Sequence, residues 1–381
     1  MREEQYSTLN LIACCREGTL GYNQARCDDC RHREWYASSC GDRHCPNCLG
    51  PRQAEWSEQV CGRLPDCPHF HVVFTVPAQL HEAFELNYQI FATELFGGAA
   101  ETLKLFQENN WRMEGGFLAV LHTWGRALNW HPHLHVLVSA GGRDCATGRW
   151  RQARPNYLFP VRSMSKVFGA ILLRRLEALE SHPEVRWPEG LGTPEARRAW
   201  RQDLAGRHWN IFSRATLGNT RAVVRYLARY TSRIAISNQR IKRIDEDQRT
   251  VSFEWKDYKD GGRTKEMTMS GATFLRSFTR HMVPKRFRRI RYFGLLAGAK
   301  GRHLGLPGAP AESLGEKTVK TPRPVCPSCG GCQWRYLRFN LLLAGQPHSI
   351  PHTSSNPAQE GSNRFSLYPP KTGPPRVQQD G

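Results

Sequence analysis

The sequence predicts an α+β protein in which a cysteine-rich ribbon precedes a central antiparallel sheet flanked by helices. Seven of its thirteen cysteines lie within residues 14–48, where apolar periodicity is scarce. Closely spaced segments of β character follow from residue 69, and segments with helical spacing lie between and after them. The chain of 381 residues is long enough for two domains with buried cores. We expect domains at 1–60 and 68–297, followed by a largely disordered tail at 298–381.

Three segments are predicted to be strands of the sheet. His69–Val76 has β character and stops at a proline, and Phe117–Trp124 follows a pair of glycines. His133–Ser139 comes after a short connection and ends at Gly141-Gly142. Strands joined by so short a connection pair antiparallel, because a parallel crossover needs a dozen or more residues.

Four further segments have the spacing of helices. Apolar residues recur every three or four positions across 80–110, 163–180, 195–206 and 221–233. Another strand is expected at 251–255, before a Gly-Gly turn. After about residue 298 the composition turns to glycine, proline, serine and charge, and 344–381 has too few apolar anchors to become ordered.

The charge balance predicts a polyanionic partner. Lysine and arginine number 54 against 34 aspartates and glutamates, which gives a formal net charge of +20 and a pI near 9.7. Phosphates attract such a surface and release counterions on contact, whereas the alternative is a basic surface that only keeps the protein in solution. No apolar run has membrane-spanning length and no apolar signal core precedes residue 14. We therefore exclude a membrane-spanning or secreted protein and expect a cytoplasmic one.

Two Cys-x-x-Cys pairs predict a structural zinc site. Cys27 and Cys30 form the first pair, and Cys45 and Cys48 form the second, with residues 31–44 between them. Zinc prefers four tetrahedral ligands, which two such turns supply when a small ribbon brings them together. A reducing compartment keeps these thiols free for metal rather than for disulfides. We expect all four cysteines to bind one zinc ion.

Other potential ligands leave alternatives open. Cys14, Cys40 and His44 lie near the two pairs and could replace a ligand, although a packed side chain is the favoured role for each. Three cysteines near the end of the chain have no obvious second pair: Cys326, Cys329 and Cys332. The histidines that could complete them, at 348 and 352, lie in the segment expected to be disordered. A metal ion there is the less favoured interpretation.

A histidine-rich strand predicts a second kind of metal site. Side chains alternate along a strand, so His131, His133 and His135 share one face. Imidazoles spaced in this way make half of a site for a divalent cation, and an exposed polar strand face is the alternative. His69 and His71 repeat the same spacing on the first strand. The pattern does not decide between the two pairs, but the third histidine favours the later one.

A helical segment carries paired tyrosines beside a stripe of arginines. Tyr226 and Tyr230 are four residues apart and share a face, and the stripe next to them consists of Arg225, Arg229 and Arg233. Such a stripe suits a phosphate backbone. On its own, a tyrosine pair is more often part of an amphipathic core edge than a pair of nucleophiles. A phenol attacks at neutral pH only if the phosphorus is made electrophilic, which a cation held by histidines would do.

Several motifs, taken in order, resemble one family. They are Ser39–Cys48, Phe70–Pro77, Val120–Gly125, His131–His135, Tyr226–Ser237 and Phe253–Tyr258. Most are weak singly, but the ordered set is specific and spans about residues 14–297. The chain resembles the HUH rolling-circle transposases of the insertion-sequence ninety-one type, in which a zinc-binding domain precedes an HUH-nuclease domain.

The resemblance implies a catalytic metal site. It selects His133 and His135 as ligands of a Mg²⁺ or Mn²⁺ ion and leaves His71 on a preceding strand. It also implies a third ligand, for which His131 is a candidate. In such nucleases the histidine pair lies on a middle strand of a central antiparallel sheet, and the tyrosine lies on a helix that faces it.

The resemblance also implies a reaction. A metal-dependent endonuclease and strand transferase of this kind uses Tyr226 or Tyr230 to attack a DNA phosphate, which leaves a 5′-phosphotyrosine link and a free 3′-hydroxyl. The second tyrosine then serves the paired cleavage or the transfer. The implied partner is single-stranded DNA at transposon ends and at the target, at the nucleoid of a bacterium.

Two other functions stay open. A plasmid replication initiator or mobilisation relaxase would use the same chemistry, although the leading zinc ribbon favours the transposase. The second is an inactive zinc-containing DNA-binding protein. The chain departs from the family in a short segment before Cys14 and in a proline-rich sequence after Leu296. A truncated copy is therefore also an expectation.

Overall fold

The chain folds into two compact units. The computed structural model describes residues 3–48, 56–57, 59–61, 64–65, 67–153, 158–216, 235–297 and 325–338. One unit comprises residues 1–13 and 39–319, and the other comprises residues 14–38 and 320–381. The segments expected to be helical at 221–233 and disordered at 344–381 lie outside the described residues. The domain boundaries expected from the sequence stay a prediction.

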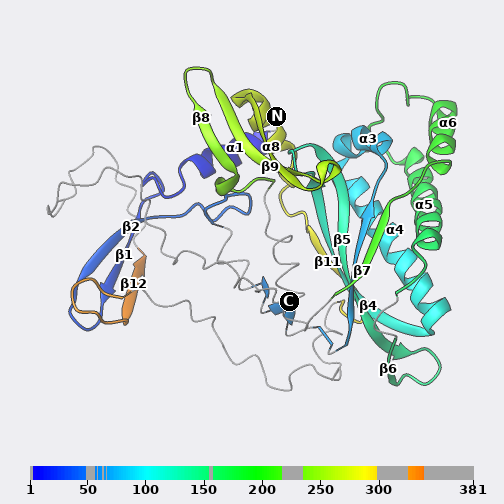
Figure 1. Cartoon of the computed structure of the whole chain (residues 1–381), viewed down its shortest axis with the longest axis horizontal. Helices are drawn as coiled ribbons and strands as arrows, with labels where there is room; N and C mark the ends of the chain where they lie inside the picture. Colours follow the sequence, from blue (N-terminus) through cyan, green and yellow to red (C-terminus); the bar gives the residue numbers. More distant parts are fainter. Residues whose placement is uncertain are drawn as a thin grey trace, which may run out of the picture. The chain divides into compact units, whose positions relative to one another are not determined.

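A six-stranded sheet forms the centre of the first unit, as far as the structure describes it (Figure 1). The strand order is β11-β4-β5-β3-β7, and β6 pairs with β5. The strands are β3 (His69–Thr75), β4 (Met113–Trp124), β5 (Trp130–Asp144), β6 (Trp150–Gln152), β7 (Ile211–Ala215) and β11 (Ile290–Gly294). All the pairings are antiparallel. The predicted α+β fold with a central antiparallel sheet flanked by helices is confirmed.

One face of this sheet carries the main hydrophobic core. Phe70, Val72 and Phe74 of β3 point into it, as do Leu134 and Val136 of β5. The long helices α4 (Tyr88–Phe106) and α5 (Val161–Ala178) cover this face with apolar side chains (Figure 1). The strand residues that alternate with these core residues must point to the opposite face, because side chains alternate along a strand.

The remaining helical segments of this unit are short. They are α1 (Glu3–Ala13), α3 (His81–Leu86), α6 (Pro194–Ala205), α8 (Gly271–Arg280) and the single turns η1 (Ala78–Leu80), η2 (Gln107–Trp111), η3 (Leu179–Ser181), η4 (Asn238–Arg240) and η5 (Tyr258–Asp260). The helix expected at 80–110 is interrupted at Asn87. Its side-chain amide accepts from the backbone N–H of Arg186 at 2.7 Å and donates to the carbonyl of the same residue at 2.7 Å. In the described part of the chain, no helix combines the length and apolarity needed to cross a membrane.

The glycine pair expected to end the third strand lies inside it instead. β5 continues past Gly141 and Gly142 to Asp144, and Gly142 pairs with Gly115 of β4. A Cβ atom at Gly142 would lie 2.4 Å from the carbonyl oxygen of Glu114. Glycine is needed here because the two strands approach closely, and not because the strand stops.

A second, smaller sheet completes the first unit. It consists of β8 (Ile241–Asp245), β9 (Thr250–Asp257) and β10 (Arg263–Ser270), with β9 in the middle. β9 is the strand expected at 251–255. Phe253 is fully buried and forms a cluster with Leu128, Ala235 and Ile236, against which Phe274 and Phe278 of α8 pack.

The second unit contains a three-stranded antiparallel sheet among its described residues. Its order is β12-β1-β2, built from β1 (Tyr22–Cys27), β2 (Arg33–Ala37) and β12 (Trp334–Arg338). Figure 1 shows β12 beside β1, although the two come from opposite ends of the chain. β12 lies in the region that the sequence predicted to be largely disordered.

Candidate functional site

Three histidines from two neighbouring strands meet on the face of the central sheet opposite α4 and α5. His133 and His135 lie on β5, and His122 of β4 pairs in register with His133. Each offers a ring nitrogen, and the three nitrogens lie within 4.8 Å of one another. Their exposed fractions are only 2% for His122, 9% for His133 and 8% for His135. The cluster is therefore nearly closed off from bulk water.

Hydrogen bonds turn two of these rings toward a common point. Nδ1 of His133 lies 2.6 Å from the backbone carbonyl oxygen of His131. A carbonyl only accepts, so this nitrogen carries the proton and Nε2 keeps its lone pair. Nδ1 of His135 lies 2.8 Å from Nε2 of His71. The Nε2 atoms of His133 and His135 then face each other across 3.2 Å, as two ligands of one cation would.

Burial favours the neutral form of the His133 and His71 rings. Removal from water lowers the pKa of His133 to about 4 and that of His71 to about 4. At neutral pH, no further proton therefore competes for the Nε2 lone pair of His133. Neutral imidazole is the form that binds metal.

The structure gives the other candidate histidines different places. His71 supports the pair, since its ring lies nearly coplanar with that of His135, with 5.1 Å between centroids and 6° between planes. The ring of His131 lies 4.9 Å from that of His133, but His131 is outside the group of converging nitrogens. His122 offers the third converging nitrogen, the role for which His131 was the candidate. The sequence offered a signal for His122, because it lies within the expected strand 117–124, but not the register that pairs it with His133.

The tyrosine pair cannot be placed in the same way. Tyr226 and Tyr230, with the stripe Arg225, Arg229 and Arg233, lie outside the described residues. The described chain reaches this segment from β7, where Arg214 pairs with His71 of β3. The described chain resumes at Ala235, which belongs to a hydrophobic cluster against which Trp124 packs. The ring of Trp124 in turn stacks on that of His122, with 4.6 Å between the ring centroids. Both described ends of the segment thus lie next to residues that contact the histidine cluster.

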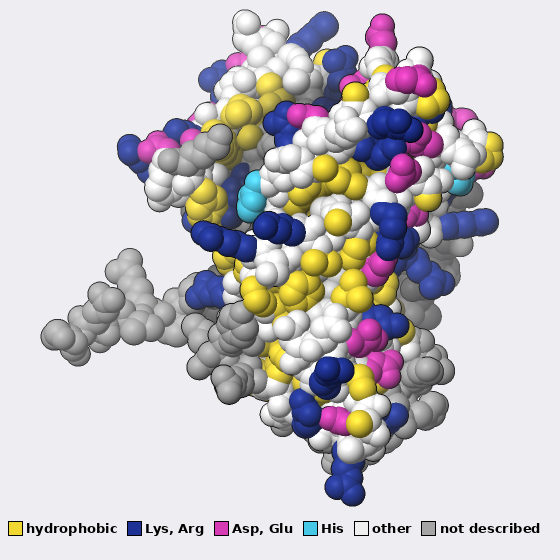
Figure 2. Space-filling view, turned by 90° about the vertical axis from the view of Figure 1, so that its right-hand side faces the viewer, with side chains coloured by type: hydrophobic (Ala, Val, Ile, Leu, Met, Phe, Trp, Pro, Cys, Tyr) yellow, Lys and Arg dark blue, Asp and Glu magenta, His cyan; other side chains and the backbone are white. Residues whose placement is uncertain are grey.

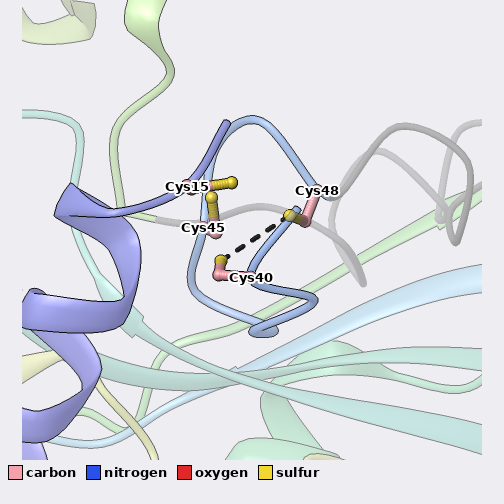
Figure 3. A group of neighbouring side chains, drawn as sticks. All are labelled: Cys15, Cys40, Cys45 and Cys48. Carbon is pink, nitrogen blue, oxygen red and sulfur yellow. Dashed lines mark hydrogen bonds between the residues drawn. The ribbon is translucent and has the colours of Figure 1, made fainter. Parts of the chain in front are cut away.

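Three cysteines gather in the turn at residues 40–48 of the first unit. The sulfurs of Cys40, Cys45 and Cys48 lie within 4.8 Å of one another, with 3.7 Å between those of Cys40 and Cys48. Figure 3 shows these side chains converging and draws them with Cys15. Cys45 and Cys48 are buried, and none of the three forms a disulfide. Thiols arranged in this way can bind zinc.

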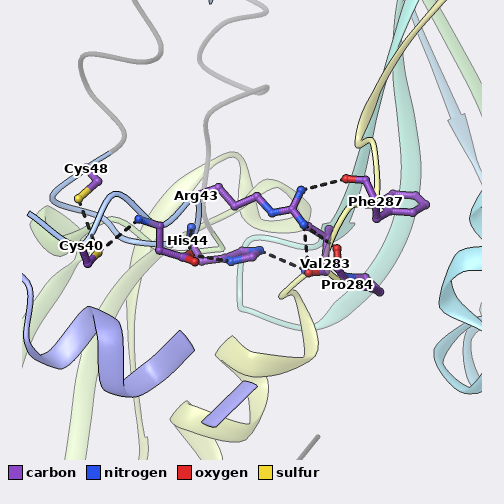
Figure 4. Close-up of polar contacts among 8 residues, drawn as sticks. Cys40, Arg43, His44, Cys48, Val283, Pro284 and Phe287 are labelled. Atoms are coloured by element: carbon purple, nitrogen blue, oxygen red, sulfur yellow. Dashed lines mark hydrogen bonds and ion pairs between the residues drawn. The ribbon is translucent and has the colours of Figure 1, made fainter. Parts of the chain in front are cut away.

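Two residues inside this turn fasten it to the chain that leads into β11 (Figure 4). Arg43 donates to the backbone carbonyls of Phe287 at 2.9 Å and Pro284 at 2.6 Å. His44 donates from Nδ1 to Asp42 at 3.0 Å and accepts at Nε2 from the backbone N–H of Val283 at 3.1 Å. Both nitrogens of His44 are therefore occupied, which removes it as an alternative zinc ligand in this arrangement.

The two Cys-x-x-Cys pairs predicted to share one zinc ion belong to two different cysteine groups. Cys27 and Cys30 gather in the second unit with Cys326 and Cys329, while Cys45 and Cys48 gather with Cys40. This corrects the predicted grouping of Cys27, Cys30, Cys45 and Cys48. The spacing within a pair identifies a metal-binding turn, but the fold decides which turn it meets.

A basic groove opens beside β11. This cavity of about 660 Å³ is lined by Gln89, Thr93 and all of residues 285–293 except Arg289. Lys285, Arg286 and Arg288 are exposed in it, next to the aromatic rings of Tyr292 and Phe293. Cationic side chains interleaved with rings suit single-stranded nucleic acid, because rings stack on bases while cations bind phosphates. The sequence did not lead us to predict this groove, although the alternation of basic and aromatic residues in 285–293 is a signal that could have identified it.

The face that carries α5 and α6 has a different charge pattern. Figure 2 shows Lys and Arg side chains there interspersed with Asp and Glu. Ion pairs join Arg175 to Glu94 at 2.8 Å and Arg207 to Asp203 at 2.9 Å. Basic charge on this face is therefore offset, which makes it a poorer phosphate-binding surface than the basic groove.

Comparisons with known proteins show which families and relatives the chain is similar to. Residues 116–303 match a family model described as "Putative transposase", and residues 1–76 match one described as "Transposase zinc-binding domain". The chain is 37% identical to "Putative transposase y4qJ" of Sinorhizobium fredii over 297 residues, which cover 77% of this chain and 74% of that protein. It is 31% identical to "Transposase for insertion sequence element IS801" of Pseudomonas savastanoi pv. phaseolicola over 302 residues, which cover 78% and 71%. No solved structure matches the chain.

Proposed function

The chain belongs to the IS91-type transposase family, and on this premise we propose that it nicks and transfers single-stranded DNA through a 5′-phosphotyrosine intermediate, as in rolling-circle transposition. The observation that carries the proposal is the 3.2 Å approach of Nε2 of His133 to Nε2 of His135, with His122 beside them. A DNA substrate would place this activity at the nucleoid.

The histidine cluster fits a divalent transition-metal ion. Its donors are three imidazole nitrogens, whereas Mg²⁺ is held chiefly by oxygen ligands. Of the two ions expected from the sequence, this donor set favours Mn²⁺ over Mg²⁺. When bound, the ion would draw charge from a phosphate oxygen and make the phosphorus more electrophilic.

The residues of this chain would then perform a transesterification. The phenolic oxygen of Tyr226 or Tyr230 loses its proton and bonds to phosphorus, and the bond from phosphorus to the 3′ oxygen breaks. The 3′ oxygen takes up a proton and leaves as a hydroxyl. One phosphate ester replaces another, so the reaction needs no ATP, and the second tyrosine can repeat the step on another strand.

Zinc has a structural part in the proposal. The match to a zinc-binding domain and the cysteine clusters support structural zinc. We propose Cys40, Cys45 and Cys48 as three of four ligands.

Two alternatives remain distinguishable. A replication initiator or relaxase would share the chemistry, but the match to a transposase zinc-binding domain favours the transposase. A DNA-binding protein without catalysis would have no need for buried imidazole nitrogens that converge on one point.

The position of a label on the DNA tests the proposal. Single strands that span the ends of the element encoding the chain are incubated with the full chain and Mn²⁺, then denatured. A label 3′ of the nick should stay on the protein, whereas a label 5′ of it should leave with the 3′-hydroxyl fragment. Retention of the 5′ label alone would show the opposite linkage and refute the proposal.

Replacement of His71 by leucine should weaken metal-dependent cleavage by about 10- to 100-fold, the usual cost of losing a partner that orients a metal-binding histidine. The partner lost is the 2.8 Å contact to Nδ1 of His135. The measurement is the Mn²⁺ concentration that gives half-maximal cleavage. His71→Gln, which can accept from the same nitrogen, should recover most of the affinity. An unchanged Mn²⁺ requirement in His71→Leu would show that His71 only fills space.

Removal of the exposed cations of the basic groove should weaken single-stranded DNA binding and its salt dependence. The Lys285→Ala, Arg286→Ala, Arg288→Ala variant should lose about 2 units of the log–log salt slope, at about 0.7 per phosphate contact. Binding isotherms at several salt concentrations measure the slope. A matched variant of three exposed cations on α6 and α5, Arg198→Ala, Arg162→Ala, Lys166→Ala, should keep it. Equal slopes in the groove variant and the unaltered chain would show that DNA phosphates do not bind in the basic groove.

A further inference from the structure

The second unit contains a four-cysteine cluster built from the two ends of the chain. Cys27 and Cys30 come from the end of β1 and the turn after it, and Cys326 and Cys329 come from the turn that precedes β12. The family models match residues 1–76 and 116–303, so the later pair lies outside both.

The two pairs adopt the same backbone turn. The N–H of Arg31 donates to the carbonyl of Cys27 at 3.0 Å, and the N–H of Gly330 donates to that of Cys326 at 2.9 Å. The residue after each second cysteine is left-handed, with φ of 65° at Arg31 and 74° at Gly330. The backbone N–H of each first cysteine also donates to the carbonyl of the residue two positions after the second cysteine. Cys27 donates to His32 and Cys326 donates to Gly331, both at 2.8 Å. Sequence and backbone thus repeat one metal-binding turn twice.

The four sulfurs have the spacing of a tetrahedral metal site. They lie within 4.8 Å of one another, with 3.7 Å from Cys27 to Cys329 and 3.7 Å from Cys30 to Cys326. Four ligands at about 2.3 Å from zinc in tetrahedral geometry lie about 3.8 Å apart. All four are free thiols, so the approach is not that of a disulfide.

The sheet that carries these turns has few buried apolar side chains among its described residues. None of the three hydrophobic clusters in the described chain includes a residue of 14–38 or 325–338. The aromatic side chains of this sheet are partly exposed, with Trp35 at 51% and Tyr336 at 58%. A small sheet without a core is marginal in water, and a bound metal supplies the missing folding free energy in such cases.

We propose that Cys27, Cys30, Cys326 and Cys329 bind a zinc ion that fastens the C-terminal turn and β12 onto the N-terminal hairpin. The chain then holds two zinc ions, one here and one at the cluster of Cys40, Cys45 and Cys48. The consequence is that residues 325–338 form part of the zinc-binding fold and are not a dispensable tail.

Zinc content of the full chain tests this proposal independently of DNA cleavage. The chain purified with zinc should contain two equivalents, and the Cys326→Ser, Cys329→Ser variant should contain one. Cys332→Ser alters the exposed cysteine beside the cluster and should keep both. A double variant that keeps two equivalents would overturn the proposal.

A conservative variant separates metal binding from misfolding. Cys329→His keeps a four-ligand set that zinc accepts and should retain two equivalents. In the cobalt-substituted chain, this variant should show weaker thiolate-to-cobalt absorption, because one sulfur ligand has been replaced by nitrogen. Cobalt absorption identical to that of the unaltered chain would exclude Cys329 as a ligand and contradict the proposal.

Discussion

Replacement of His133 or His135 by alanine is expected to lower the rate of DNA cleavage by about a thousandfold, with DNA binding nearly unchanged. The expected size follows from the several kcal/mol that a metal ion contributes to a phosphoryl transition state, since each 1.36 kcal/mol is about tenfold in rate. DNA affinity is expected to depend on cationic side chains elsewhere, such as those that line the basic groove. Single-turnover cleavage and equilibrium binding of the same oligonucleotide measure the two effects separately.

The neighbouring histidines provide a matched pair of tests. His122→Ala should lower cleavage strongly, because His122 offers the third converging nitrogen. His131→Ala should have a small effect, since it keeps the backbone carbonyl that lies 2.6 Å from Nδ1 of His133, and the His131 ring is outside the group of converging nitrogens. Loss of cleavage in His131→Ala with none in His122→Ala would restore His131 as the third ligand. Thermal melting of both variants checks that the sheet remains folded.

Replacement of both Tyr226 and Tyr230 by phenylalanine is expected to abolish the covalent protein–DNA link. Each change removes one hydroxyl and keeps the ring, so the loss is that of the nucleophile and not of a packed side chain. Each single variant should keep the reaction of the remaining tyrosine, which assigns the order of their use. Denaturing gels with a label 3′ of the nick measure the link.

An exposed tyrosine elsewhere in the chain serves as the control. Tyr258 is 62% exposed, and the guanidinium of Arg126 lies 3.6 Å from its ring centroid. Tyr258→Phe keeps that contact and should form the link at the full rate. A Tyr226→Phe, Tyr230→Phe protein that still forms the link would require another nucleophile.

Much of the fold followed from the sequence because strand periodicity is a local property. Alternation along His69–Val76 placed Phe70, Val72 and Phe74 on one face, and the structure buries all three in the core. The ends of elements depended on contacts that a sequence does not display. The break at Asn87 depends on the backbone of Arg186, 99 residues later, and the continuation of β5 through Gly142 depends on its closeness to β4.

The candidate site shows the same limit at the level of single residues. His131 was a reasonable third ligand, because it shares a face with His133 and His135. Four residues along a strand, however, span about 13 Å, whereas a residue directly opposite on the next strand lies about 5 Å away. His122 holds that opposite position, which only the register of β4 against β5 reveals.

The sequence revealed each cysteine pair but not which pairs come together. Each Cys-x-x-Cys turn was visible in the sequence, and the structure gives the turns at Cys27 and Cys326 matching hydrogen bonds. Their pairing was not visible, because nothing local relates residue 27 to residue 326. Proximity along the chain favoured Cys45 and Cys48 as partners of the first pair, and the antiparallel pairing of β1 with β12 decided otherwise.

The most direct test of the central claim is to find the amino acid that becomes attached to DNA. The adduct formed by the unaltered chain is trimmed with nuclease, digested with protease and mapped by tandem mass spectrometry. The account predicts a nucleotide phosphate on the phenolic oxygen of Tyr226 or Tyr230. A nucleotide attached to any other residue would contradict it.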